Sequence, residues 1–325
     1  MKKTLFYLPV LFIAVALLSF TFSTHHKNQA ADKPAANTPA LNFIVMGDWG
    51  RNGEDHQKEV ARQMGKTAKE MGVSFVVSTG DNFYPSGVVS EFDPLWRYSF
   101  EDIYTDFSLQ FDWYPILGNH DYKSDPDAQV AYSKISRRWK MPARYYSKTF
   151  NIPGSNGQKV LIAFIDTNPL IKEFYSNTEY GPNVASQDTL QQKRWLEEVL
   201  STPDPDIQWK LVVGHHPMFS GGMRKEGYDT KAIRSTLKPL LDKHEADAYI
   251  SGHEHDLQHI LPEGKTHHFI SGSASEIRKT GKLPESKFAA SEYGFMVFSV
   301  TKDAILVQVI NDEGKVLYKT KLEKR

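Results

Sequence analysis

From about Leu41 onward, short apolar runs alternate with longer stretches in which polar and apolar residues are mixed. Most of the apolar runs are unbroken rather than strictly alternating, which is typical of strands that are covered on both faces. The strand candidates are LNFIVM (41–46), VSFVV (73–77), WYPIL (113–117), VLIAFI (160–165), KLVV (210–213), DAYIS (247–251) and HHFIS (267–271).

Helical periodicity separates several of these runs. It predicts helices over 54–71, 188–200 and roughly 230–244, each with apolar residues on one side. Beyond residue 290 the pattern changes to GFMVFSV, AILVQVI and KVLYKTKL, which are expected to form antiparallel strands joined by short turns. The chain is therefore predicted to be an α/β protein with a mixed sheet system and helices outside.

The N-terminus carries a different pattern. Two lysines precede a mostly apolar span from Leu5 to Phe22, so residues 1–22 are expected to be an export signal. The length of this span leaves both cleavage and retention as an N-terminal anchor open, although Pro9 and the polar residues near its far end favour cleavage. Residues 23–40 are expected to be a disordered linker, and 41–325 the folded domain, located in the periplasm or outside the cell.

Charge and cysteine content exclude some functions. Without residues 1–40 the chain has 35 basic and 38 acidic residues, a net charge of −3, so no nucleic-acid partner is expected. A membrane would be contacted only through an uncleaved N-terminal segment. Because the chain has no cysteine, its stability must come from packing and from any bound metal.

Five strand candidates run into a glycine followed by polar residues. The five clusters are GDWG (47–50), GDNFY (80–84), GNHD (118–121), GHHP (214–217) and GHEH (252–255). Since ligands of α/β sheets bind beyond the carboxyl ends of the strands, the clusters are expected to meet in one place.

The side chains in these clusters are oxygen and nitrogen donors, the hard and borderline ligands of metal ions. By type we count seven such donors, namely two aspartates, one tyrosine, one asparagine and three histidines. Seven are too many for one catalytic ion that must keep an open position, but they suit two ions that share one carboxylate. The sequence therefore predicts a dinuclear metal centre.

The order of the five clusters resembles that of the metallophosphoesterase (calcineurin-like) superfamily and, within it, the purple acid phosphatases of the small tartrate-resistant type. The resemblance covers roughly residues 41–275. It implies a four-layer α/β/β/α sandwich of two mixed β-sheets flanked by helices, and makes residues 41–325 a metallophosphoesterase catalytic domain. The tyrosine in GDNFY distinguishes the purple acid phosphatases, because a phenolate is a hard anionic donor that favours Fe(III).

Carried over residue by residue, the resemblance implies two sets of ligands. Asp48, Tyr84 and His255 would bind Fe(III), and Asp81 would bridge to a second ion. That ion, a divalent iron, zinc or manganese, would be bound by the remaining donors, Asn119, His215 and His253.

The implied reaction is the hydrolysis of phosphate monoesters, in which a metal-bound hydroxide attacks phosphorus in line with the leaving alcohol. His120 would donate a proton to the leaving oxygen or hold a phosphate oxygen, with Asp121 as its orienting partner. The family usually has a further active-site histidine in the loop that corresponds to 219–227. Here this loop offers Arg224 and Lys225, and His216 is the only histidine nearby, so these three are candidate substrate-binding residues.

Two other functions stay open at this point. One is a phosphodiesterase or nucleotide pyrophosphatase of the same superfamily with two manganese or zinc ions. The other, from a different class, is an envelope binding protein whose metal site is vestigial. None of the seven donors is missing, which favours an enzyme.

Overall fold

The computed structural model describes residue 1 and residues 39–324. The expected signal or anchor and most of the expected linker lie outside these residues. Among the residues that are described, no helix is both long and apolar enough to cross a membrane.

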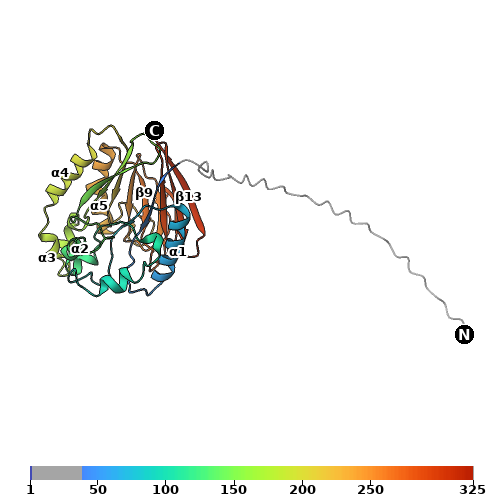
Figure 1. Cartoon of the computed structure of the whole chain (residues 1–325), viewed down its shortest axis with the longest axis horizontal. Coiled ribbons are helices and arrows are strands. Elements are labelled where there is room, and N and C mark those ends of the chain that lie inside the picture. Colours follow the sequence, from blue (N-terminus) through green and yellow to red (C-terminus); the bar gives the residue numbers. More distant parts are fainter. Residues whose placement is uncertain (2–38, 325) are drawn as a thin grey trace. The chain divides into compact units, whose positions relative to one another are not determined.

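Two mixed β-sheets form the centre of the domain (Figure 1). The first has the strand order β13-β12-β11-β1-β2-β3. Strands β1 to β3 run parallel to one another, while β11 lies antiparallel to β1 and continues into an antiparallel meander. Its strands span β1 Leu41–Met46, β2 Phe75–Ser78, β3 Trp113–Pro115, β11 Gly294–Val300, β12 Ala304–Asn311 and β13 Val316–Glu323.

The second sheet has the order β10-β8-β9-β7-β6-β5-β4. Strands β5, β6, β7 and β9 are parallel in its middle, and antiparallel strands close both edges. Its strands span β4 Tyr146–Asn151, β5 Lys159–Phe164, β6 Ile207–Val213, β7 Ala248–Ser251, β8 Leu257–Ile260, β9 His267–Ser271 and β10 Ser286–Ala290.

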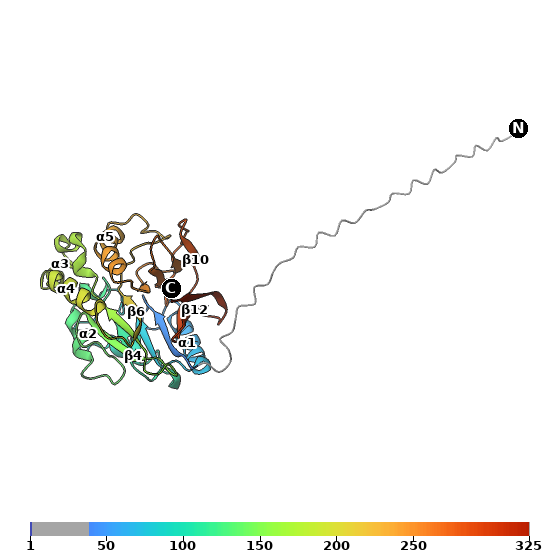
Figure 2. The same cartoon turned by 90° about the horizontal axis from the view of Figure 1, so that it is seen from above.

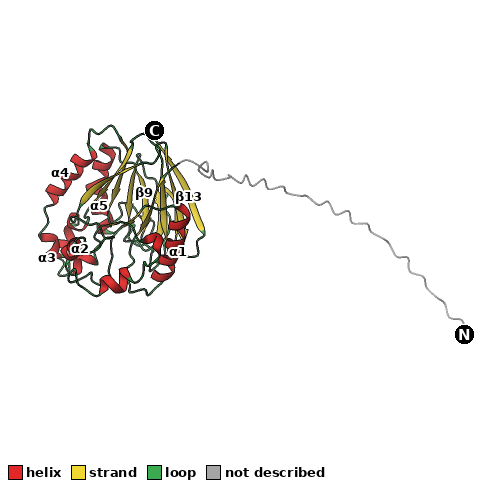
Figure 3. Cartoon of the chain, viewed as in Figure 1, coloured by secondary structure: helices red, strands yellow, loops and turns green. Residues whose placement is uncertain are grey.

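Helices cover the outer faces of the two sheets (Figures 2 and 3). Helix α1 packs on β1 and β11 of the first sheet, and α4 packs on β5 of the second. Figure 1 shows α5 on the same side as α4 and away from α1. The α-helices span α1 Gln57–Met71, α2 Pro126–Tyr132, α3 Gly181–Ala185, α4 Thr189–Leu200 and α5 Tyr228–Lys243. The four-layer α/β/β/α arrangement expected from the sequence is confirmed.

Aromatic side chains join the sheets face to face. Phe43 in the first sheet stacks on Phe75 and Phe298 of the neighbouring strands, with ring centroids 4.9 and 5.2 Å away. Phe75 also stacks on Phe150 of β4 at 4.1 Å, and Phe298 contacts Phe269 of β9 at 5.3 Å. These contacts bury apolar surface from both sheets and fix how the carboxyl ends of the parallel strands are placed.

Some element boundaries differ from the sequence prediction. Helix α1 begins at Gln57 rather than at 54, because Asp55 and His56 have left-handed φ values of 52° and 38°, which a helix cannot include. Strands β4, β8 and β10 were not expected. Strand β4 is an edge strand with mostly exposed residues, so it lacks the apolar run that marks the central strands.

We expect Phe43→Ala to lower the free energy of unfolding by about 3–5 kcal/mol, because a fully buried ring that stacks on two others would leave a cavity. Urea unfolding followed by circular dichroism measures the change. Phe107→Ala is the matched control, since Phe107 is 92% exposed and its loss is expected to change stability by at most about 0.5 kcal/mol. Equal losses in the two variants would contradict this account of the core.

Candidate metal centre

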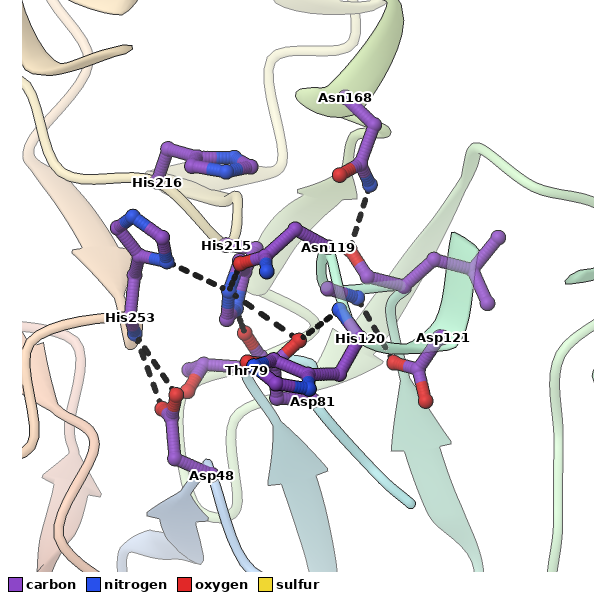
Figure 4. Close-up of polar contacts among 12 residues, drawn as sticks. Asp48, Thr79, Asp81, Asn119, His120, Asp121, Asn168, His215, His216 and His253 are labelled. Atoms are coloured by element: carbon purple, nitrogen blue, oxygen red, sulfur yellow. Dashed lines mark hydrogen bonds and ion pairs between the residues drawn. The ribbon is translucent and has the colours of Figure 1, made fainter. Parts of the chain in front are cut away.

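The five polar clusters follow β1, β2, β3, β6 and β7, all of which lie in the parallel parts of the two sheets. Parallel strands end at the same edge, so their carboxyl-terminal loops are neighbours. Figure 4 shows side chains from these loops pointing toward one another. The sequence prediction that the clusters converge is confirmed.

One group of donors surrounds the hydroxyl of Tyr84. This oxygen lies 3.0 Å from Asp81 Oδ2, 3.2 Å from Asp48 Oδ1 and 3.2 Å from Nε2 of His255. All four side chains are buried. Three separate loops therefore bring two carboxylates, a phenol and an imidazole to within the distances that a single ion could span.

A second group surrounds Nε2 of His215. It lies 3.2 Å from Asn119 Oδ1, 3.1 Å from Nδ1 of His253 and 3.5 Å from Asp81 Oδ1. The two oxygens of Asp81 thus face different groups. Asp48, Asp81 and His215 also have donor atoms within 4.8 Å of one another, as an ion binding site requires.

An unusual backbone conformation directs three of these side chains into the site. Asp48, Asp81 and His253 have φ values of 59°, 48° and 68°, in the left-handed region that residues other than glycine seldom adopt. Strain of this kind costs on the order of 1 kcal/mol or more per residue and is typically found at functional sites.

The glycines of the clusters allow close approach. A Cβ atom on Gly118 would lie 2.1 Å from Asp81 Oδ1, and one on Gly252 would lie 2.4 Å from Asp48 Oδ2. Any side chain at these two positions would displace a carboxylate, which explains why the glycine precedes the donor residues.

Two of the three histidines in these groups have their outer nitrogen held by an oxygen. His215 Nδ1 donates to the carbonyl of Thr79 at 2.8 Å, and His253 Nε2 donates to Oδ2 of Asp229 at 2.8 Å. Nδ1 of His255 lies 3.4 Å from Glu276 but has no hydrogen-bond partner among residues 39–324. The two hydrogen bonds leave the inner nitrogens of His215 and His253 with a free lone pair pointing into the site, as in protein metal centres.

Asp229 and Glu276 were not expected from the sequence. Asp229 lies in the first turn of α5, and Glu276 follows β9 in a loop without regular structure. Nothing in their sequence neighbourhoods marks them as histidine partners, because the contacts depend on how distant loops pack.

Burial and charge set the ionisation of the donors. Burial lowers the pKa of His253 well below its ordinary value, so the imidazole is neutral and can offer a lone pair. Burial, followed by the charges of Asp81 and Asp48, raises the pKa of the Tyr84 phenol well above its usual range. A phenolate at this position therefore requires a strongly charged cation as its partner.

The histidine of GNHD lies at the edge of the site. His120 is partly exposed, its ring is 4.5 Å from the ring of Tyr84, and its Nδ1 donates to the Pro85 carbonyl at 2.6 Å. Its backbone N–H donates to Oδ1 of Asp81 at 2.8 Å. Nε2 is therefore the nitrogen of His120 that is available to a ligand.

The structure corrects the orienting role expected of Asp121. Instead of contacting the ring of His120, its carboxylate accepts hydrogen bonds from the backbone N–H groups of Asn82, Phe83 and Gly118 at 2.8–3.2 Å. Burial and the charge of Asp81 raise the pKa of Asp121 to about 7, while the bonds from Gly118 and Asn82 lower it. Asp121 thus fixes the loop that carries Asp81 and Tyr84, and the Pro85 carbonyl orients His120.

The three candidate substrate-binding residues differ in their positions. Arg224 is 31% exposed, and its guanidinium lies 3.5 Å from Asp229 and 3.8 Å from Glu254. Lys225 is exposed, and no contact of its side chain appears within the described part of the chain. Arg224 therefore forms an ion pair with Asp229, the carboxylate that accepts a hydrogen bond from His253. Lys225 has no such contact with the donor groups.

His216 is fully buried beside the second donor group. Its ring centroid is 4.3 Å from that of His253, and its Nδ1 is 2.8 Å from Thr167 Oγ1 (Figure 4 shows its ring above His253). Within residues 39–324, its Nε2 has no hydrogen-bond partner. Burial lowers the pKa of His216 well below its ordinary value, so this imidazole is neutral.

Comparison with known proteins places the chain in a family. Residues 41–257 match the model of the calcineurin-like phosphoesterases. Purple acid phosphatase 17 of Arabidopsis thaliana is 35% identical over 93% of this chain and 90% of its own length. Tartrate-resistant acid phosphatase type 5 of Sus scrofa is 35% identical over 89% of both chains.

Solved structures agree on the fold. GAP50, described as the anchor in the inner membrane complex of Plasmodium, superposes with a TM-score of 0.76 at 25% identity and covers 89% of this chain and 90% of its own. A purple acid phosphatase from Lupinus luteus superposes with a TM-score of 0.65 at 14% identity over 88% of this chain and 54% of its own.

The fold and the cluster of oxygen and nitrogen donors define a calcineurin-like phosphoesterase. Within that superfamily, the chain belongs to the purple acid phosphatases, a family of metal-dependent phosphomonoester hydrolases. The resemblance inferred from the five glycine-led clusters is confirmed.

We expect Asp121→Asn to lower the free energy of unfolding by about 1–3 kcal/mol, because an amide nitrogen would replace one of the oxygens that accept buried N–H groups. The measurement is urea unfolding with a chelator present, which removes any contribution of bound metal. Asp303→Asn is the control, since the Asp303 side chain is 76% exposed. Unfolding of Asp121→Asn at the wild-type urea concentration would exclude the anchoring role.

Proposed function

We propose that the chain is an exported acid phosphatase that hydrolyses phosphate monoesters at a dinuclear centre of Fe(III) and a divalent ion. The observation that carries the proposal is the convergence of seven buried donor side chains around two points, with Asp81 between them. Family membership supports the reaction. Export rests on the pattern of residues 1–22, which lie outside the described residues.

The donors around Tyr84 fit a ferric ion. Two carboxylates, a phenol and an imidazole form a hard, anionic set, and the raised pKa of the phenol means that a highly charged cation is needed to stabilise it as phenolate. Asp48, Tyr84 and His255 would hold the Fe(III), and Asp81 would bridge.

The donors around His215 fit a divalent ion. Asn119, His215 and His253 offer one amide oxygen and two imidazole nitrogens, a set that suits iron, zinc or manganese. Together the two ions would supply Lewis acidity that activates water and polarises the phosphoryl oxygens.

His120 is proposed to protonate the leaving oxygen. Because Nδ1 is committed to the Pro85 carbonyl, Nε2 can donate a proton only when the ring is cationic. This geometry links proton donation to acidic solution.

Arg224 and His216 are proposed as substrate-binding residues. Arg224 reaches the site from the loop before α5 with a partly exposed guanidinium, which suits a phosphate oxygen. His216 offers a neutral ring nitrogen without a partner beside the second donor group. Lys225, being exposed and unattached, is expected to contribute less than either.

The similarity to GAP50 makes a binding protein with an inactive site the second candidate, because that neighbour is described as an anchor. A phosphodiesterase with two manganese or zinc ions is the alternative within the superfamily. The three functions differ in their metal content, in their visible absorption and in whether they hydrolyse a monoester or a diester.

We expect protein purified without chelator to hold two metal ions, to absorb visible light and to hydrolyse p-nitrophenyl phosphate faster than bis-p-nitrophenyl phosphate at acidic pH. The visible band would arise from charge transfer between the Tyr84 phenolate and Fe(III), so Tyr84→Phe is expected to abolish it. Tyr318→Phe is the control, because that hydroxyl bonds His259 rather than the donors. A colourless protein with diesterase activity would favour the alternative enzyme, and a metal-loaded protein without either activity would favour the binding protein.

We expect His120→Ala to lower kcat by a factor of about 10²–10⁴ while the metal content stays unchanged, because the ring is not one of the seven donors. Steady-state kinetics with p-nitrophenyl phosphate, together with metal analysis, measure both quantities. His56→Ala is the control, since His56 is half exposed and pairs with Asp312 away from the site. Loss of metal from His120→Ala would contradict the assigned role.

A further inference from the structure

A second arginine, Arg51, lies over the site without belonging to any donor group. It directly follows GDWG, and its guanidinium carbon is 3.9 Å from the centroid of the Tyr84 ring. Its side chain is only 20% exposed. A cation centred on the face of an aromatic ring at this distance is attracted by the ring's π electrons.

Two residues from the loop after β9 hold this guanidinium in place. Arg51 Nε donates to Ser275 Oγ at 3.1 Å, and Nη2 donates to the Glu276 carboxylate. Ser275 in turn donates to the backbone carbonyl of Asp48 at 2.6 Å. The position of the cation over the ring is therefore defined by a network rather than by one contact.

Glu276 connects the cation to a second donor residue. Its carboxylate also lies 3.4 Å from Nδ1 of His255, and Arg278 Nε lies 3.4 Å from its other oxygen. Arg51 and Glu276 thus link Tyr84 to His255. These are two of the three residues proposed to bind Fe(III) and not the second ion.

We propose that Arg51, fixed by Ser275 and Glu276, is a positioning residue that holds the Tyr84 ring in place. When Tyr84 binds iron, the guanidinium also stabilises the π electrons of the phenolate ring. The inference rests on the proposed function, because it requires Fe(III) at Tyr84. The electrons that move to iron in the charge-transfer transition are delocalised over the ring beneath the guanidinium. The positive charge lowers their energy, so the transition requires more energy with Arg51 than without it.

The test compares absorption spectra of iron-loaded variants at equal iron content. Arg51→Met keeps the length of the side chain but removes its charge. We expect it to move the visible maximum to longer wavelength by about 10–20 nm, a shift that corresponds to the energy of an interior cation–π interaction. Arg51→Lys keeps the charge, so its maximum is expected to lie closer to the wild-type wavelength than that of Arg51→Met. Arg97→Met is the matched control, because Arg97 is exposed and pairs with Asp102.

A maximum that stays at the wild-type wavelength in Arg51→Met would overturn the inference. If Arg51→Met does not fold, Arg51→Gln carries the same expectation, since it keeps N–H donors for Ser275 and Glu276 without the charge. Failure of the proposed function looks different, because the wild-type protein would then lack the band or Tyr84→Phe would keep it.

Discussion

The arrangement of the site depends on two buried carboxylates that share one phenol hydroxyl. Asp48 and Asp81 both contact Tyr84 at 3.0–3.2 Å with almost no exposure to water. Two negative charges at such distances repel one another in a poorly polarisable interior unless cations compensate them. Burial keeps the His253 imidazole neutral by lowering its pKa, so it cannot provide that charge. Burial also opposes a charge on His255, but contacts with Asp48 and Glu276 outweigh it and raise the pKa of that ring. The two metal ions proposed for the site would compensate both carboxylates.

The scaffold imposes this arrangement through several independent features. Parallel strands from two sheets end at one edge, and left-handed backbone at Asp48, Asp81 and His253 turns the donors inward. Glycines leave room for the carboxylates. The Asp121 carboxylate fixes the loop of Asp81 and Tyr84 by accepting hydrogen bonds from backbone N–H groups. Asp229 and the Thr79 carbonyl orient His253 and His215 through hydrogen bonds to their outer nitrogens. The chemistry proposed for the site is concentrated in loops, while the aromatic contacts between the sheets keep those loops in register.

Sequence reasoning succeeded where residues of similar function recur after apolar runs. The five polar clusters and the central strands were identified because a buried parallel strand has an unbroken apolar pattern and its end is marked by glycine. Edge strands such as β4 were missed, since their exposed residues resemble a loop. The role of Asp121 was assigned wrongly, because adjacency to His120 in sequence suggested a contact, whereas the His120 ring bonds the Pro85 carbonyl and the Asp121 carboxylate accepts backbone N–H groups.

The sequence by itself determined which side chains could bind metal and which family the chain resembles, because both depend on residue type and order along the chain. Only the tertiary structure decided which nitrogen of each histidine faces the site, which carboxylates support the histidines, and that Arg51 lies on the Tyr84 ring. These are contacts between loops separated by many residues. Their geometry follows from how two sheets pack, which no local pattern of residues encodes.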